Sequence, residues 1–194
     1  AAHGGAASFA RFMELALYTP GFGYYSAGAR KFGAAGDFIT APELSPLFSR
    51  CLAAQCAQVL GALGGGDILE FGAGTGVMAA DMLAELARLG QMPARYLILE
   101  VSAELRERQR RVLQERVPSL LPRIHWLESL PASLSGVIVA NEVLDAMPAS
   151  RFRRTVGGFE EITVSVEAGK FAWSTRPAAR SEERRVGKEC ISRW

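Results

Sequence analysis

Acidic and amide side chains follow two strongly apolar stretches of the chain. Glu100 comes near the end of Tyr-Leu-Ile-Leu-Glu-Val, and Asn141, Glu142 and Asp145 follow Val-Ile-Val-Ala. A carboxylate beside a buried strand end needs a polar partner, because a buried charge without one is costly. Such a carboxylate can accept both hydroxyls of a ribose or can face a polar substrate. These residues are therefore the first candidates for a ligand site.

Three alternating glycines follow another apolar run, which begins at Asp67. The run ends at Phe71 and is followed by Gly72, Gly74 and Gly76. A helical pattern comes next, so this stretch predicts a strand that turns sharply into a helix. Glycine allows the unusual backbone angles of such a turn and lets a ligand lie against bare main chain. A tight turn without a ligand is the alternative.

The spacing of these glycines separates two classes of ligand. The dinucleotide pattern is Gly-x-Gly-x-x-Gly, whereas here the third glycine comes one residue earlier and Glu70 lies two residues before the first. This variant resembles motif I of the class I S-adenosylmethionine-dependent methyltransferases, whose cofactor carries no phosphate. The resemblance implies that Glu70 and the loop bind that cofactor. The loop residues are Gly72, Ala73, Gly74 and Gly76.

Acids lie at the ends of the next two predicted strands, with Glu100 near the C-terminal end of the strand predicted over 96–101. Glu100 lies 24 residues after Gly76, close to the spacing of about 20 at which nucleotide-binding folds place a ribose-binding carboxylate. The alternative is that Glu100 is an N-terminal acid of the helix predicted over 102–117, where the helix dipole favours it. Glu128 closes a short strand over 124–127. It suits contact with an adenine amino group, and exposure in a loop is equally compatible with its position.

The substrate side is expected at the fourth predicted strand, 137–140. Ligands of open α/β sheets bind beyond the carboxyl ends of the strands, where the strand order switches, and here the switch falls between the first and fourth strands. Asn141, Glu142 and Asp145 are therefore expected to face a substrate. For Asn141, capping of a short helix is the alternative.

A loop near the N-terminus supplies further candidates. Residues 33–45 contain too much glycine and proline for a regular element, yet they include Asp37, Thr40 and Glu43. Polar groups on a loop restrained by glycine and proline are candidates for a site. Asp37 is alternatively a turn residue. Ser45 is expected to cap the helix that begins at Pro46.

The periodicity predicts an α/β, Rossmann-like fold with a parallel core of four strands, an N-terminal helical extension and a C-terminal β-meander. Helices are expected over 8–18, 46–63 and 102–117, with a fourth from the glycine loop to Gly90. The meander is expected over 152–156, 159–166 and 170–174. Two helix faces are predicted to be buried: Phe48, Cys51, Leu52, Val59 and Leu60 on one helix, and Ala79, Met82, Leu83, Leu86 and Leu89 on the other.

Composition argues for one globular core without a metal site. The chain has 194 residues, 49% hydrophobic, and a net charge of +2 with scattered basic residues, which disfavours nucleic-acid binding. The histidines are His3 and His125, and Cys51, Cys56 and Cys190 form no Cys-x-x-Cys pair, so zinc and disulfides are not expected. No apolar run reaches the ~18 residues needed to span a bilayer. A reducing compartment fits this cysteine usage.

Several strings of residues resemble one family. Phe-Met-Glu-Leu-Ala-Leu-Tyr-Thr-Pro-Gly-Phe-Gly-Tyr-Tyr-Ser, Gly-Asp-Phe-Ile-Thr-Ala-Pro-Glu-Leu-Ser-Pro-Leu-Phe and Ala-Asn-Glu-Val-Leu-Asp-Ala-Met-Pro are similar to the MidA-type family. Its members are the bacterial and mitochondrial relatives of the complex I assembly methyltransferase. The resemblance covers residues 3 to about 152. It implies a class I methyltransferase fold, S-adenosyl-L-methionine as cofactor, and methylation of a protein arginine.

The resemblance also sets expectations for domains, partners and location. Residues 1–180 are expected to form the N-terminal part of a longer methyltransferase domain, and the charged stretch 181–194 to be a non-native or disordered tail. The implied partner is a protein substrate such as a respiratory complex I subunit, in the bacterial cytoplasm or, in a eukaryote, the mitochondrial matrix. For an arginine substrate, Glu142 and Asp145 would bind the guanidinium. The alternatives are a non-catalytic assembly factor that keeps the cofactor fold and a nicotinamide-dependent oxidoreductase.

Overall fold

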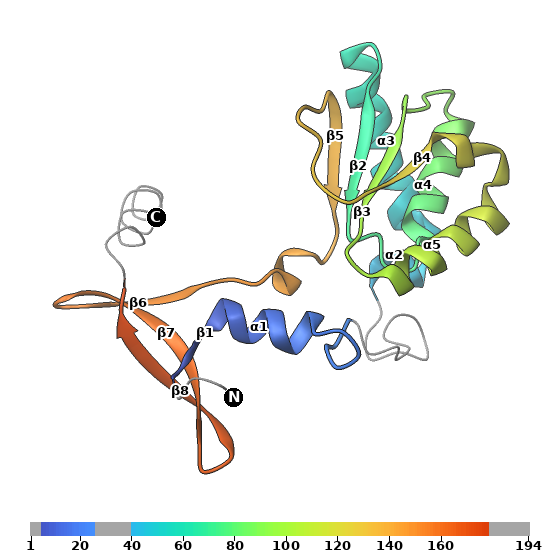
Figure 1. The fold of residues 1–194 in the computed structure, drawn as a ribbon. Coiled ribbons are helices and arrows are strands. Elements are labelled where there is room, and N and C mark those ends of the chain that lie inside the picture. Colours follow the sequence, from blue (N-terminus) through green and yellow to red (C-terminus); the bar gives the residue numbers. More distant parts are fainter. Residues whose placement is uncertain (1–4, 26–39, 179–194) are drawn as a thin grey trace. The chain divides into compact units, whose positions relative to one another are not determined.

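The structure is a computed structural model that describes residues 5–25 and 40–178 (Figure 1). The chain divides into two compact units. Residues Tyr25–Asp145 form one, called here the parallel-sheet unit, and Ala1–Tyr24 joins Ala146–Trp194 in the other, called the meander unit. The domain boundary predicted at residue 180 and the predicted tail lie outside the described residues.

Four parallel strands form the sheet of the parallel-sheet unit. They are β2 (Asp67–Phe71), β3 (Tyr96–Leu99), β4 (Ile124–Leu127) and β5 (Gly136–Ala140), in the order β4-β3-β2-β5. The first strand in sequence lies between the second and the fourth, which confirms the predicted switch in strand order. At the carboxyl edge, Phe71 pairs with Leu99 on one side and with Ala140 on the other.

Three helices pack against one face of this sheet and form the hydrophobic core with it. They are α3 (Pro46–Leu63), α4 (Val77–Arg88) and α5 (Ala103–Arg116). The chain also forms the short helix α2 (Ala41–Leu44) and the 3-10 turns η1 (Pro118–Arg123) and η2 (Leu144–Ala146). In the core, apolar residues of the strands pack against apolar residues of the helices. The strands contribute Ile68, Tyr96, Ile98, Ile124 and Val139, and the helices contribute Ala53, Leu60, Met82, Leu83 and Leu113. The predicted fold class is confirmed.

The buried face predicted for α3 was wrong in part: Leu60 is buried and Leu52 packs against the core, but the other three predicted residues are exposed. The bounds Pro46–Leu63 match the prediction, and Ser45 caps the helix by accepting a hydrogen bond from Leu47 N at 3.2 Å. However, the buried residues are Ser49, Ala53, Cys56 and Leu60, whereas Phe48, Cys51 and Val59 are exposed. Apolar residues lie almost all round this helix, so periodicity did not identify its inner face.

Two further predictions were wrong at the ends of elements. Leu89 is 40% exposed, because α4 ends at Arg88 and Leu89 is its C-cap residue, with Gly90 following at φ +70°. Residues 41–44 form helix α2, although the stretch 33–45 was predicted to contain no element. Proline is tolerated in the first turn of a helix, where its missing N–H has no partner to lose, so Pro42 does not prevent this turn.

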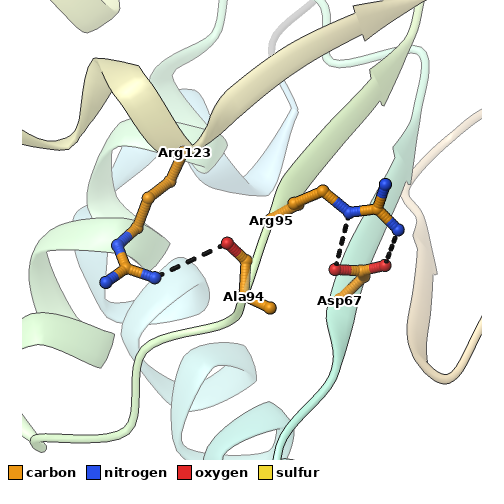
Figure 2. Close-up of polar contacts among 4 residues, drawn as sticks. All are labelled: Asp67, Ala94, Arg95 and Arg123. Atoms are coloured by element: carbon orange, nitrogen blue, oxygen red, sulfur yellow. Dashed lines mark hydrogen bonds and ion pairs between the residues drawn. The ribbon is translucent and has the colours of Figure 1, made fainter.

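The amino edge of the parallel sheet is held by arginines (Figure 2). Arg95 donates from Nε to Asp67 Oδ1 at 3.1 Å and from Nη2 to Asp67 Oδ2 at 2.5 Å. Arg123 Nη1 donates to the carbonyl oxygens of Pro93 at 3.0 Å and of Ala94 at 3.5 Å. These contacts tie the starts of β2, β3 and β4 together. The amino edge thus has a structural role, and the candidate site lies at the opposite edge.

The meander unit is an antiparallel sheet with one helix. Strands β6 (Arg151–Thr155), β7 (Gly158–Glu167) and β8 (Lys170–Pro177) confirm the predicted meander. The short strand β1 (Ala7–Ser8) also pairs with β7, which the sequence did not reveal. Ser8 then caps α1 (Phe9–Tyr18), as predicted, by accepting a hydrogen bond from Arg11 N. None of the residues of α1 is buried.

Candidate cofactor site

The glycine loop carries β2 into α4 with three residues in the left-handed region. Gly72, Gly74 and Gly76 have φ of +58°, +53° and +86°. Gly72 N donates to Leu99 O at 2.9 Å, and Gly76 N donates to Ala73 O at 2.8 Å. Side chains rarely adopt such angles, so the three glycines are required by the shape of this turn.

The surroundings of these glycines show which side of the loop is open. A Cβ on Gly72 would lie 3.3 Å from Val143 Cγ2, and one on Gly76 would lie 3.0 Å from Gln109 Cα. A Cβ on Gly74 would meet nothing within 4 Å. A side chain at Gly72 or Gly76 would therefore press on a neighbouring residue, whereas the space beside Gly74 is open. Gly72 itself is exposed, Gly74 half-buried and Gly76 buried.

Glu43, from the stretch 33–45, makes a hydrogen bond with the glycine loop. The hydroxyl of Thr75 donates a hydrogen bond to Glu43 Oε1, and Thr75 is buried. Glu43, on α2, was one of the polar candidates of the stretch 33–45, and the structure brings it to the glycine loop. Thr40, half-buried, is the N-cap residue of α2 but makes no side-chain capping bond. Asp37 lies outside the described residues.

Glu100 lies one residue beyond β3, and both of its oxygens accept hydrogen bonds. Oε1 accepts from Ser102 N at 2.9 Å and Oε2 from Gln109 Nε2 at 3.2 Å, while the side chain is only 5% exposed. Burial raises the pKa of this carboxyl, and the two hydrogen bonds partly oppose that rise. The contact with Ser102 N, at the start of α5, also fits the alternative of an acid at a helix N-terminus.

An arginine of α5 ties two strand ends of the site together. Arg106 Nε donates to Glu100 O at 2.6 Å, and Arg106 Nη2 donates to Leu127 O at 2.8 Å. Glu128 is exposed directly after β4. Its position is compatible with both interpretations given above.

Tyr25 is a half-buried tyrosine whose main chain contacts the residue before α5. The pKa of its phenol is raised, first by burial and then by the charges of Asp145 and Glu100. Ser102 Oγ donates to Tyr25 O at 3.5 Å. The predicted substrate-side acid and the predicted ribose acid thus both contribute to the raised pKa of this phenol. Tyr25 was not among the candidate site residues predicted from the sequence.

The polar segment after β5 lies beside the glycine loop. Asn141 is half-buried, and Glu142 and Asp145 are exposed. Val143 packs on Gly72, which places the segment at the carboxyl edge of the sheet. Glu142 has a φ of +55°, an uncommon angle for a residue with a side chain. Such strained residues cluster at functional sites.

Glu70 lies inside the core below the glycine loop. It is fully buried; its Oε2 accepts a hydrogen bond from the Tyr96 hydroxyl at 2.8 Å, and its Oε1 has no hydrogen-bond partner among the described residues. Burial raises the pKa of this carboxyl to about 7; the Tyr96 hydrogen bond opposes the rise and the charge of Glu100 adds to it. In this structure Glu70 therefore pairs with Tyr96 inside the core.

Neither a metal site nor a membrane span is present in the described parts of the chain. Within residues 5–25 and 40–178, no three His, Cys, Asp or Glu side chains are grouped so that they could hold a metal ion. In the same ranges no helix is long and apolar enough to cross a membrane.

The chain is similar to known methyltransferases. Residues 51–193 match a family described as "Putative S-adenosyl-L-methionine-dependent methyltransferase". The mitochondrial protein arginine methyltransferase NDUFAF7 of Danio rerio is 31% identical over 91% of this chain and 49% of that protein. Its Homo sapiens counterpart is 29% identical over 84% of this chain and 42% of that protein. The chain thus spans about half the length of these curated relatives.

A solved structure shows the same fold with a ligand bound. The protein, from Burkholderia thailandensis, was determined bound to S-adenosyl-homocysteine; it is 48% identical, with a TM-score of 0.84, over 95% of this chain and 49% of that one. A second structure from Burkholderia thailandensis is 47% identical, with a TM-score of 0.80, over 95% of this chain. The predicted cofactor agrees with the family, while the roles of individual side chains stay predictions. The chain belongs to this S-adenosyl-L-methionine-dependent methyltransferase family, the MidA-type family named by the resemblance.

Proposed function

We propose that this chain forms the cofactor-binding part of a protein arginine methyltransferase. S-adenosyl-L-methionine would lie at the carboxyl edge of the parallel sheet, with its ribose at Glu100 and its methionine portion along the loop from Gly72 to Gly76. The observation that carries this proposal is the Glu100 carboxylate, buried and held at both oxygens beside the glycine loop. A carboxylate held in place at this position can accept hydrogen bonds from the two neighbouring hydroxyls of a ribose.

The residues present fit this cofactor. The main chain at Gly74 is open, as a nucleoside lying against the loop requires. Glu100 keeps acceptor capacity after its two hydrogen bonds, because an ionised carboxylate has about four lone-pair positions. Glu70 is fully buried beneath this edge of the sheet and is not exposed to a ligand in this structure. When bound, the cofactor supplies a methyl group on a sulfonium.

The acids after β5 supply the substrate side. Glu142 and Asp145 would bind a guanidinium and orient one of its nitrogens, because carboxylates match guanidinium geometry with paired hydrogen bonds. Asn141 lies between β5 and these acids in the sequence. Tyr25, close to Asp145 and Glu100, would help to separate the two halves from water. Arginine is always protonated in solution, and the cation is a poor nucleophile. The acceleration of methyl transfer would therefore come from alignment of the reacting atoms.

The substrate class rests on the relatives. The mitochondrial relatives are named protein arginine methyltransferases, and the structures from Burkholderia thailandensis show the fold in a bacterium. A protein substrate therefore remains our proposal, with a respiratory complex I subunit as the specific prediction from the family resemblance. We propose the bacterial cytoplasm as the location, or the mitochondrial matrix if the source is a eukaryote.

Methyl transfer to arginine tests the proposal. The full-length protein is incubated with tritiated cofactor and cell extract, and labelled amino acids are separated after hydrolysis. We expect label in methylarginine for the wild type, almost none for Glu142→Gln, and wild-type incorporation for the control Glu115→Gln, an exposed acid of α5. Cofactor binding without any incorporation would instead support the non-catalytic assembly factor. Label confined to another amino acid would contradict the arginine substrate.

A further inference from the structure

Gln109 is a buried polar residue to which the proposed chemistry assigns no role. It lies on α5 and is fully buried. Its Nε2 donates to Gly74 O at 3.0 Å and to Glu100 Oε2 at 3.2 Å, and its Oε1 accepts from Trp126 Nε1 at 2.9 Å. One amide thus contacts the glycine loop, the predicted ribose acid and β4.

The orientation of this amide follows from its partners. The indole N–H of Trp126 can only donate, so it requires the amide oxygen of Gln109. Both N–H groups of the amide are then left for Gly74 O and Glu100 Oε2, which can only accept. A flipped amide would place oxygen against a carboxylate and a carbonyl, and would remove the acceptor of the indole N–H. Trp126 therefore fixes which atom Gln109 presents to Glu100.

The backbone of α5 is held at the same place. Gly76 packs directly on Gln109, since a Cβ there would lie 3.0 Å from Gln109 Cα. One turn earlier, Arg106 donates to Glu100 O and Leu127 O. Gln109 consequently has little freedom to move away from Glu100, and its amide restrains the plane of that carboxylate together with Ser102 N.

We propose that Gln109 is a positioning residue that orients the Glu100 carboxylate toward the hydroxyls of the cofactor ribose, and that Trp126 sets the orientation of Gln109. The inference rests on the proposed function, in which Glu100 accepts these hydroxyls. A carboxylate whose two oxygens are already held is ordered before the ligand arrives, so binding does not have to restrain it. Gln109 thereby contributes to selection of a nucleoside with both hydroxyls.

Two ligands separate this role from a general structural one. The full-length protein is titrated calorimetrically with S-adenosylhomocysteine and with its 2′-deoxy analogue, and the ratio of the two dissociation constants is compared among variants. For the wild type we expect a preference of about tenfold for the ligand with both hydroxyls, the value of one hydrogen bond. Gln109→Met should weaken binding of S-adenosylhomocysteine more than that of the analogue, so that the preference falls to about twofold.

Two further variants make the test decisive. Trp126→Phe leaves Glu100 and Gln109 unchanged but removes the indole N–H, so it should lower the preference in the same direction by a smaller factor. Gln114→Met changes an exposed glutamine of the same helix and should leave both constants unchanged. Thermal unfolding of each variant establishes that it is folded.

The outcomes distinguish the inference from the proposed function. A wild type with the expected preference, together with equal loss of both ligands in Gln109→Met, overturns the inference alone. If Gln109→Met does not fold, an unchanged preference in Trp126→Phe overturns it. A wild type that binds neither ligand, or does not distinguish them, contradicts the proposed function and with it this role for Gln109.

Discussion

The two units of the chain hold their polar side chains in different ways. In the parallel-sheet unit, Glu70, Glu100 and Gln109 are buried and hydrogen-bonded near the carboxyl edge of the sheet. In the meander unit, charged residues pair across strands with their arginines more than half exposed, as in Arg153 with Glu160 at 2.6 Å. The first arrangement orders side chains before a ligand binds. The second joins neighbouring strands of a sheet.

Substitution of glycine by alanine should give the largest difference in stability between the two units. Gly136 begins β5 at φ +147°, and a Cβ there would collide with the main chain of Asp67. Gly136→Ala should therefore cost about 4 kcal/mol of unfolding free energy or prevent folding. Gly169, in the turn before β8, has φ +77° and open space around it. Gly169→Ala should cost only about 1 kcal/mol. Urea unfolding measures both; similar costs would remove this distinction between the units.

The pH dependence of stability should reveal the buried carboxyl of Glu70. Its pKa is raised from 4.5 to about 7, so between these values the folded chain keeps a proton that the unfolded chain releases. Stability therefore falls as pH rises through this window, by on the order of 3 kcal/mol, and this contribution is constant above it.

Glu70→Gln should remove that dependence. Urea unfolding at pH 5 and pH 8 compares the variant with the wild type, and the variant should gain relative stability at the higher pH. Glu167→Gln changes an exposed acid of the meander unit and should keep the wild-type dependence. If Glu70→Gln and Glu167→Gln behave alike, the carboxyl of Glu70 is not held in its protonated form.

Two ion pairs should give the smallest difference in stability between the units. Arg116 pairs with Asp81, which is buried on α4, whereas Arg153 pairs with the partly exposed Glu160. Arg116→Ala leaves a buried carboxylate without its partner and should cost about 2 kcal/mol. Arg153→Ala should cost about 0.5 kcal/mol, as for other exposed pairs. Thermal unfolding in low and high salt measures both, and equal losses would show that burial of Asp81 carries no extra weight.

The sequence predicted the elements that depend on local pattern. The strand before Gly72, the helix over 46–63 and the meander all form close to their expected bounds, because each has a clear period and is bounded by glycine or proline. The order of the parallel strands followed from general rules for α/β sheets. Glu100 was predicted near the end of a strand over 96–101, and in the structure it lies one residue beyond β3.

Long-range polar contacts could not be predicted in this manner. Gln109 and Arg106 look like solvated residues of a charged helix, and only the packing of α5 against the strand ends makes them part of the site. The bond from Thr75 to Glu43 joins residues 32 positions apart. Likewise, the inner face of α3 depends on which of its many apolar residues meets the sheet. These features are set by tertiary structure rather than by local sequence.

The central claim is that Glu100 receives the ribose of the cofactor. A crystal structure of the full-length protein with S-adenosylhomocysteine tests it most directly. We predict that both ribose hydroxyls lie within hydrogen-bond distance of the Glu100 carboxylate and that the homocysteine portion follows the main chain at Gly74. A ribose bound elsewhere, with Glu100 still held only by Ser102 and Gln109, would contradict the account.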